Sequence, residues 1–350
     1  MSFRAIPVVV LAGFLGAGKT TLLNHLLAHS GGNRIGVVVN DFGAIGIDAM
    51  SVAGQAGSTV SLGNGCMCCA VDGSELDTYL DRLTRPENRL DAIVIEASGL
   101  AEPQELVRMV LGTENPHARY GGLIEVVDAA HFDATRTRHP ETDRHLALAD
   151  LVVLNKRDQV AEAELDRVGD VLAGLAPGSP VLPVAHGRID PELLFECRPR
   201  EEQVAGQLSF EELLHPERDH TAHPHAAYES VAFTSAEPLD PRRLMAFLDT
   251  RPAGLYRIKG FVDLGAGDPR NRYGLHAVGR FLRFHPEPWP AGEPRLTQLV
   301  LIGAGIDADA VRKQLDGCRV TDADLPQDPD VLERAMWGVL RYAPDGDDPA

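Results

Sequence analysis

The feature that most constrains the fold is the octapeptide at residues 13–20, G-F-L-G-A-G-K-T, which has the pattern G-x-x-x-x-G-K-T. An apolar run at residues 6–11 precedes it, and leucines with helical spacing follow it. Between a strand and a helix this pattern predicts a phosphate-binding loop, because backbone N–H groups and the helix N-terminus bind phosphate oxygens. The predicted nucleotide contacts are Gly13, Gly16, Ala17, Gly18, Lys19, Thr20 and Thr21.

Strand-like and helix-like segments alternate through the first two hundred residues. Short continuous apolar runs predict strands that are buried on both faces. These runs are residues 6–11, 35–39, 92–95, 123–127, 151–154 and 181–184. Helical patterns lie between them, for example at 74–83, 103–111 and 161–175. The alternation predicts an α/β fold with a doubly wound, mostly parallel sheet.

The rest of the chain has a different pattern. Strands are predicted at 228–235, 255–264, 275–284 and 298–302, and helices at 240–249 and 307–315. Strands that follow one another without helices predict a smaller α+β domain with an antiparallel sheet. We therefore expect a nucleotide-binding domain (1–200), a linker (201–226), the α+β domain (227–318) and an acidic tail (319–350) in which residues 331–340 can form a helix.

Charge and cysteine content exclude several kinds of partner. The 33 basic and 51 acidic residues give a formal net charge of -18, which repels nucleic acid and anionic membranes. The apolar run at residues 5–18 is too short to span a bilayer and continues into the phosphate loop, so it is not read as a signal peptide. Five cysteines, three of them within four residues, do not resemble a secreted disulfide scaffold. We expect a cytoplasmic protein that binds neither nucleic acid nor membrane.

A second motif concerns the base of the nucleotide. The tetrapeptide N-K-R-D at residues 155–158 follows a predicted strand and matches N-K-x-D. Its aspartate can accept hydrogen bonds from guanine N1–H and the exocyclic amine, two donors that adenine does not offer. Alone the tetrapeptide is often only a polar strand end, but after a phosphate loop it favours GTP and GDP. The residues assigned to guanine binding are Asn155, Lys156, Asp158 and, one strand further on, Ala185.

A third motif concerns magnesium. The predicted strand at residues 92–95 leads to Glu96, which we expect to orient Mg²⁺ together with the Thr20 hydroxyl, directly or through water. Gly99 can present its backbone N–H to the γ-phosphate, and Lys19 reaches the β and γ oxygens. The alternative is a capped strand end, with Ser98 starting the next helix.

Three cysteines form the most informative short motif. Cys66, Cys68 and Cys69 follow the glycine-rich segment at residues 63–65, which places them in a loop and not in a core. Adjacent Cys68 and Cys69 have little freedom to pair with each other. Thiolates that converge bind Zn²⁺ or another soft ion, and the lack of a second C-x-x-C leaves the site open, as metal transfer requires. Redox chemistry is the alternative.

Together these motifs resemble the CobW family of metal-handling P-loop GTPases. The resemblance rests on the segments at residues 13–20, 40–43, 46–48, 66–69, 96–99 and 155–158, and continues at 256–260, 278–279 and 301–303. It covers about residues 5–318. It implies GTP hydrolysis coupled to delivery of zinc, or in some branches Co²⁺ or Fe²⁺, to client metalloproteins.

The sequence departs from the family pattern at two places. Asp41 stands where the family commonly has Glu, and Ala44 stands where the family commonly has a second Glu. In place of a long histidine tract, the linker has only His215, His220, His223 and His225.

Sheet geometry suggests a mechanism. We expect the segment around Asp41 to sense the γ-phosphate, the cysteine loop to follow it, and Asp41 to position water. The candidate catalytic residues are then Lys19, Asp41 and Glu96. A homodimer is one way to complete the metal's coordination, and the sequence leaves the oligomeric state open. A phosphotransferase and a non-catalytic metal buffer are the competing interpretations.

Overall fold

The computed structural model describes residues 5–30, 32–39, 59–61, 73–99, 101–195, 229–290, 292, 294–320 and 329–343. Described residues up to 195 form one compact unit, except that residues 176–181 group with a second unit that begins at residue 229. Each unit has its own sheet. The predicted linker and its four histidines lie outside the described residues.

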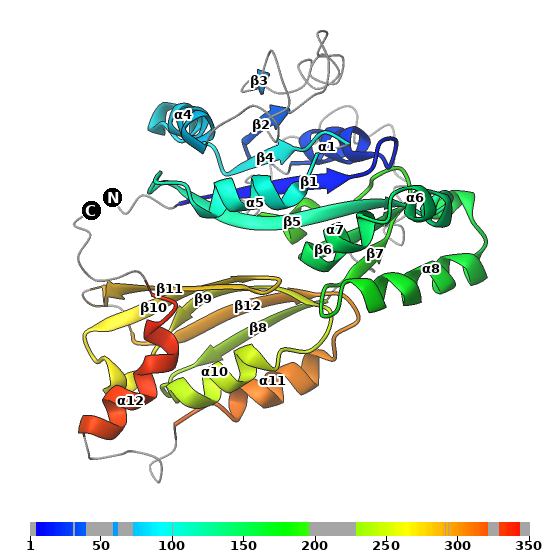
Figure 1. Ribbon diagram of the computed structural model, residues 1–350. Coiled ribbons are helices and arrows are strands. Elements are labelled where there is room, and N and C mark those ends of the chain that lie inside the picture. The colour runs from blue at the N-terminus through cyan, green and yellow to red at the C-terminus, as the bar shows by residue number, and fades with distance from the viewer. Residues whose placement is uncertain are drawn as a thin grey trace, which may run out of the picture. The chain divides into compact units, whose positions relative to one another are not determined.

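The first unit is built on a sheet whose strand order is β3-β2-β4-β1-β5-β6-β7 (Figure 1). The strands are β1 (Ile6–Gly13), β2 (Ile35–Val39), β3 (Thr59–Ser61), β4 (Ala92–Glu96), β5 (Ala118–Asp128), β6 (Leu151–Asn155) and β7 (Val181–Pro183). β1 pairs in parallel with β4 and β5, and the pairs β2–β3, β2–β4 and β5–β6 are parallel too. Every residue of β2, β4 and β6 is buried, as strands covered on both faces require. The predicted parallel sheet is confirmed.

Helices connect these strands. They are α1 (Lys19–Ala28), α4 (Gly73–Leu83), α5 (Pro103–Leu111), α6 (Phe132–Arg138), α7 (Thr142–Leu148) and α8 (Glu162–Leu175), with single turns η1 (Pro86–Asn88), η2 (Arg157–Gln159) and η3 (Pro191–Leu193). The chain runs from β1 toward β2 on one side and later toward β5 on the other. Because such crossovers are right-handed, α1 covers one face of the sheet and α5 and α7 the other. Ligands bind where this direction reverses, which here is at the carboxyl end of β1.

Helices α6 and α7 were not predicted. Each has seven residues, and each buries very little: Phe132 in α6, and Thr142 and Leu146 in α7. Such short segments carry no apolar stripe of helical period, so they form through their contacts with the rest of the unit rather than through a sequence signal.

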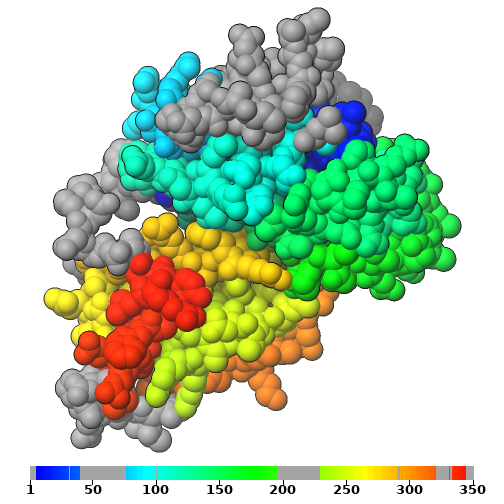
Figure 2. Space-filling view, in the orientation of Figure 1, coloured from blue at the N-terminus to red at the C-terminus, as the bar shows by residue number. Residues whose placement is uncertain are grey.

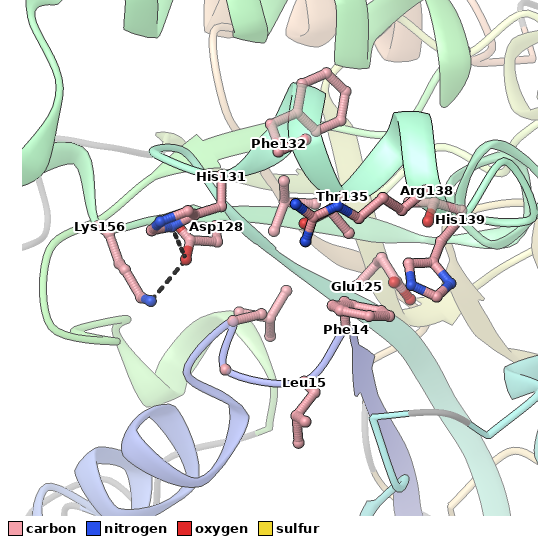
Figure 3. Close-up of a pocket in the computed structure, with 16 residues that line it drawn as sticks. Phe14, Leu15, Glu125, Asp128, His131, Phe132, Thr135, Arg138, His139 and Lys156 are labelled. Carbon is pink, nitrogen blue, oxygen red and sulfur yellow. Dashed lines mark hydrogen bonds and ion pairs between the residues drawn. The ribbon is translucent and has the colours of Figure 1, made fainter.

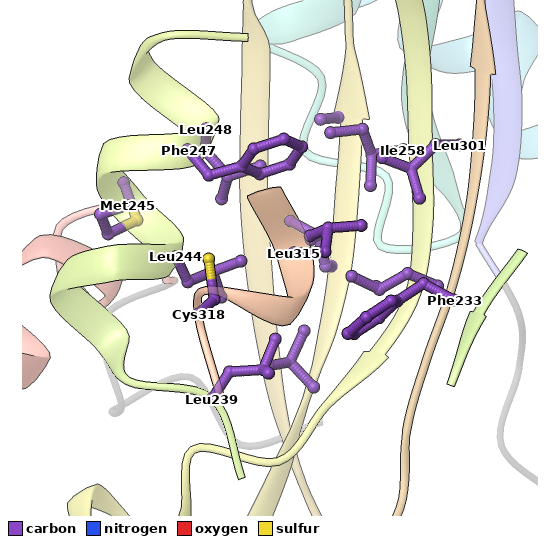
Figure 4. Close-up of a cluster of buried hydrophobic side chains, with 14 of the residues drawn as sticks. Phe233, Leu239, Leu244, Met245, Phe247, Leu248, Ile258, Leu301, Leu315 and Cys318 are labelled. Carbon is purple, nitrogen blue, oxygen red and sulfur yellow. The ribbon is translucent and has the colours of Figure 1, made fainter. Parts of the chain in front are cut away.

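The second unit has an antiparallel sheet in the order β11-β10-β9-β12-β8. Its strands are β8 (Glu229–Ser235), β9 (Leu255–Val262), β10 (Asn271–Val278), β11 (Phe281–Pro288) and β12 (Thr297–Gly303). Its helices are α10 (Pro241–Asp249), α11 (Ala308–Asp316) and α12 (Pro329–Leu340), with one turn at η6 (Gly265–Gly267). Burial alternates along β8 and β12, so one face of the sheet packs on the core. Side chains of α10 and α11 meet that face (Figure 4).

One predicted strand was wrong in its extent. Residues 275–284 were expected to form a single strand, but the chain turns within them and makes the β10–β11 hairpin, in which Val278 pairs with Phe281. The two-residue loop begins with Gly279, whose φ of 52° lies in the left-handed region. Glycine at the first loop position is typical of a tight hairpin turn. Apolar residues on both sides of this turn concealed it.

The tail contains the helix that the sequence allowed. Met336 and Val339 of α12 belong to the core of the second unit, and so does Cys318, whose pKa burial raises to about 11. Figure 2 shows α12 at the surface of that unit, and the side chain of Trp337 is 61% exposed. Among the described residues, we find no helix with the length and apolar character that crossing a membrane requires.

Candidate functional site

The phosphate loop begins at Gly13, the last residue of β1, and leads into Lys19, the first residue of α1. Gly13 and Gly18 have φ angles of 139° and 104°, in the left-handed region that favours glycine. A Cβ at Gly13 would lie 2.3 Å from the Val126 carbonyl oxygen. One at Gly18 would lie 2.3 Å from the side-chain nitrogen of Asn155. The local backbone therefore requires both glycines of the motif.

Lys19 spans the start of the loop. Its ammonium donates hydrogen bonds to the carbonyl oxygens of Gly13 at 2.8 Å and Phe14 at 3.3 Å, and the residue is only 7% exposed. The ammonium and the N-terminus of α1 both favour a bound anion at this place. Ala17 is buried and donates its N–H to Phe14, whereas Thr21 is exposed in the first turn of α1.

Thr20 and Glu96 meet beside the loop although they are far apart in sequence. The Thr20 hydroxyl donates a hydrogen bond to Glu96 Oε1 at 2.8 Å. Glu96 is the last residue of β4, is 4% exposed and pairs with Leu11 of β1, so the sheet itself sets the carboxylate next to the loop. A hydroxyl and a carboxylate are ligands that Mg²⁺ takes together with nucleotide phosphates. These two side chains therefore fit Mg²⁺, the ion that the sequence predicts they bind.

The segment that follows β4 also approaches the phosphate loop, at Gly99. A Cβ there would lie 2.7 Å from the backbone nitrogen of Leu15 and 2.8 Å from its Cα, so the backbone after β4 packs directly on the loop. No side chain other than hydrogen fits without a shift of the loop. The predicted contact between the Gly99 N–H and the γ-phosphate is compatible with this position and stays a prediction.

Strand β2 ends beside Glu96, and strand β3 ends beside β2. Val39, the last residue of β2, pairs with Glu96, and Ser61, the last residue of β3, pairs with Val39. Four predicted site residues follow these two strand ends and lie outside the described residues: Asp41, Cys66, Cys68 and Cys69. Within the described ranges, we find no group of three or more His, Cys, Asp or Glu side chains that could hold a metal ion.

Asn155 ties the phosphate loop to the loop after β7. Its side-chain nitrogen donates to the Ala17 carbonyl at 2.9 Å, and its side-chain oxygen accepts from the Gly187 N–H at 2.9 Å. The residue is 2% exposed. Both bonds are therefore shielded from water, and one side chain holds the phosphate loop and the loop after β7 in a fixed relation.

Replacing Asn155 with alanine should lower the free energy of unfolding by about 3 kcal/mol, because a buried carbonyl and a buried N–H each lose a partner at about 1–3 kcal/mol. Urea unfolding followed by circular dichroism measures this. The control is Asn88→Ala, because Asn88 bonds the Arg82 and Leu83 carbonyls near the surface and its loss should cost less than about 1 kcal/mol. Equal losses in the two variants would contradict the role assigned to Asn155.

Lys156 contacts a residue that the sequence analysis missed. Its ammonium lies 2.6 Å from Oδ2 of Asp128, the last residue of β5, and His131 lies 3.0 Å from the same oxygen. Burial by itself would raise the pKa of Asp128, but the hydrogen bonds from Lys156 and His131 outweigh it and lower the pKa. The available signal was a carboxylate at the end of a predicted strand, the same signal that led to Glu96.

Asp158 and Ala185 lie on neighbouring loops, which the Arg157 N–H joins through a hydrogen bond to the Val184 carbonyl at 3.1 Å. The side chain of Asp158 is 34% exposed, and its Oδ2 is 3.9 Å from His186 Nε2. The carboxylate is thus accessible to donors on a bound base.

A cavity of about 400 Å³ lies between the phosphate loop and the segment that includes α6 (Figure 3). Lys156 and Asp128 lie at one end, and Phe14, His139 and Glu125 at the other (Figure 3). The rings of Phe14 and His139 have centroids 4.4 Å apart. Phe14 thereby links the phosphate loop to the residue that follows α6.

Two models of known protein families match this chain, one in each unit of the structure. The model of the CobW/HypB/UreG nucleotide-binding domain matches residues 7–183, and that of the cobalamin synthesis protein CobW C-terminal domain matches residues 228–319. The chain is 32% identical to "Zinc chaperone CobW" from Sinorhizobium sp, with 88% of this chain and 95% of the relative covered. It is 31% identical to "Zinc chaperone YjiA" from Escherichia coli, with 90% and 99% covered.

A solved structure, Zn(II)-bound YjiA GTPase from E. coli, is 26% identical, covers 91% of this chain and 100% of its own, and has a TM-score of 0.43. The family model for the nucleotide-binding domain spans half of the chain, and the two curated relatives are matched almost end to end. The chain therefore belongs to the CobW/HypB/UreG family and carries the CobW C-terminal domain.

Proposed function

We propose that this protein hydrolyses GTP and couples the nucleotide cycle to the binding and delivery of a transition metal, with zinc as the first candidate. The observation that carries the nucleotide part is the pair of buried hydrogen bonds made by Asn155, to Ala17 and to Gly187. They join the phosphate loop to the loop after β7, which we assign to the base. The metal part is supported by the similarity of the chain to the two relatives described as zinc chaperones.

Guanine recognition is assigned to Asp158. Its accessible carboxylate would accept hydrogen bonds from guanine N1–H and the exocyclic amine, while Ala185 contacts the base through its backbone. The Lys156 stem would lie along the base, because its ammonium is held by Asp128 at 2.6 Å. Adenine would leave the Asp158 carboxylate without these donors, which is why GTP is preferred to ATP.

Hydrolysis of GTP requires that the attacking water be positioned and that negative charge on the phosphates be stabilised. A water molecule attacks the γ-phosphorus and the bond to the β–γ bridging oxygen breaks, which yields GDP and inorganic phosphate. Lys19 would stabilise charge on the β and γ oxygens, and Gly99 would donate its N–H to the γ-phosphate. Thr20 and Glu96 would hold Mg²⁺, which neutralises developing negative charge when bound. Asp41 is our candidate for positioning the water.

Metal binding is assigned to Cys66, Cys68 and Cys69. Thiolates favour Zn²⁺ among the common ions, and three of them leave a position open for transfer to a client. Coupling to GTP is supported by the register of the sheet: β2 ends next to Glu96, and β3 ends level with β2. Asp41 follows β2 in sequence and the cysteines follow β3, so both come after strand ends on the side of the sheet where Glu96 lies, the residue that we assign to Mg²⁺.

Zinc and nucleotide should alter each other's affinity by the same factor, because coupling free energy is reciprocal. We expect a factor of about 5 to 150, the usual range for linked sites. Zinc titrations with and without a non-hydrolysable GTP analogue give one factor, and analogue titrations with and without zinc give the other. Co²⁺ and Fe²⁺ titrations in parallel identify the metal with the strongest coupling.

Cys68→Ser should weaken zinc binding and abolish the coupling, while leaving affinity for the analogue in zinc-free buffer unchanged. Cys197→Ser, which changes a cysteine outside the cluster, is the matched control and should behave as the wild type. Unaltered zinc affinity in Cys68→Ser would refute the cysteine site. Nucleotide affinity that ignores zinc in the wild type would refute the coupling alone.

A further inference from the structure

Glu125 is a buried carboxyl group directly behind the phosphate loop. It belongs to β5, where it pairs with Ala12 of β1, the residue before Gly13. It is 3% exposed, and among the described residues its Oε2 has no hydrogen-bond partner. A buried polar atom left without a partner costs stability, and a functional role is one reason for a protein to retain it.

Two cavities meet at this carboxyl. Glu125 lines the cavity of about 400 Å³ together with Phe14 and His139 (Figure 3). It also lines a smaller cavity, of about 80 Å³, whose walls include Gly13 and Gly99. Glu125 is therefore adjacent to three parts of the site: the first glycine of the loop, the following phenylalanine and the glycine nominated for the γ-phosphate.

Lys19 is the cation that acts on Glu125. Burial raises the pKa of the Glu125 carboxyl to about 8, against the opposing effect of the Lys19 ammonium. The charged or titratable groups around the smaller cavity are Glu102, Glu141 and His145. Those around the larger one are Asp128, His131, Arg138, His139 and Lys156.

Most of these neighbours are engaged with each other. His145 lies 3.2 Å from Glu102, His139 lies 3.0 Å from Glu141, and Lys156 and His131 both contact Asp128. Glu125, by contrast, is a buried carboxyl whose Oε2 has no hydrogen-bond partner among the described residues.

We propose that Glu125 is a positioning residue of the nucleotide site: its neutral carboxyl leaves the Lys19 ammonium to the phosphates, and its ionised carboxylate competes with them for that ammonium. The Lys19 ammonium donates to the carbonyl of Gly13, and Glu125 pairs with Ala12, the residue before Gly13. An ionised carboxylate at Glu125 would therefore attract this ammonium. Bound polyphosphate would in turn make ionisation of Glu125 harder, because like charges repel. Nucleotide binding and a proton on Glu125 therefore favour each other, and the nucleotide brings a proton with it. This inference rests on the proposed function only in that Lys19 binds the phosphates.

The test is the affinity for GDP, with Mg²⁺ at a fixed concentration, measured from pH 7 to pH 9 for the wild type and Glu125→Gln. Near pH 7 Glu125 carries its proton in both the free and the bound protein, so the two affinities should agree within about threefold. As the pH passes 8, the free wild type loses this proton and must regain it to bind. Relative to Glu125→Gln, the wild type should therefore bind about tenfold more weakly at pH 9 than at pH 7.

Ionisation of GDP itself affects both proteins alike, so the ratio of their dissociation constants isolates Glu125. Glu102→Gln, which removes a carboxylate from the rim of the smaller cavity, is the matched control and should keep the wild-type profile. Calorimetry at pH 8 in two buffers of different ionisation enthalpy should show uptake of a fraction of a proton per GDP in the wild type. Glu125→Asp, which keeps an ionisable group, should retain part of that uptake.

The outcomes are distinguishable. If the wild type does not bind GDP at pH 7, the proposed function fails. If it binds at pH 7 but its affinity falls no more than that of Glu125→Gln by pH 9, the role of Glu125 is refuted and the proposed function stands. If Glu125→Gln does not fold, the absence of proton uptake in the wild type refutes the inference in its place.

Discussion

Lys19→Ala should reduce GTP hydrolysis by about 100- to 1000-fold, the usual effect of removing one charge-stabilising donor from a reacting group. In the structure the ammonium bridges the Gly13 and Phe14 carbonyls across the start of the loop. Alanine removes both the loop's internal tie and the positive charge that would meet the β and γ oxygens. Release of inorganic phosphate under saturating GTP measures the effect.

Lys313→Ala is the matched control for this variant. Lys313 is an exposed residue of α11 in the second unit, so its loss should leave turnover within twofold of the wild type, as surface changes usually do. Circular dichroism of both variants establishes that they fold. Turnover in folded Lys19→Ala at the wild-type rate would contradict the assignment of the loop as the triphosphate site.

Asp158→Asn should exchange the base preference. The amide oxygen can still accept from guanine N1–H, but the amide nitrogen donates where the carboxylate accepted, so it opposes the exocyclic amine of guanine. We expect GTP affinity to fall at least about 100-fold, since two bonds to a charged acceptor are weakened or lost. Xanthosine triphosphate has a carbonyl in place of that amine, and it should gain affinity by about tenfold or more.

Competition of GTP, ATP and xanthosine triphosphate against a fluorescent nucleotide measures the exchange. Asp166→Asn changes an exposed aspartate of α8 and should preserve the order of the wild type. A variant at Asp158 that loses affinity for all three nucleotides equally would indicate a structural role for this carboxylate instead of base recognition.

The sequence predicted the bounds of a strand correctly where burial alone determines them. β2 has the predicted bounds because its five residues are all apolar or glycine and all buried. β5 begins five residues earlier than predicted, at Ala118, because its polar start is held by pairing with β1 at Ile6 and not by hydrophobicity. Ends of strands depend on the neighbouring strand, and a single sequence does not reveal that neighbour.

The motifs predicted which residues belong to the candidate site, but they did not predict the residues that contact them. Thr20 and Glu96 were nominated for the same ion and lie within hydrogen-bond distance, because the loop chemistry demands both. Asp128 and Gly187 belong to no motif and enter the site only through folding, as partners of Lys156 and Asn155. Glu125 was visible as a lone acid within an apolar run, L-I-E-V-V, but its position behind the loop depends on the register of β1 and β5.

The double hydrogen bond of Asn155 has a consequence for how the protein is made. The phosphate loop is synthesised before the residues that fix it, because the side chain that bonds it comes at position 155 and the second partner of that side chain at 187. A nascent chain shorter than this has the glycines and the lysine without the frame that aligns them. The growing polypeptide therefore acquires both hydrogen bonds of Asn155 only after residue 187 has been synthesised.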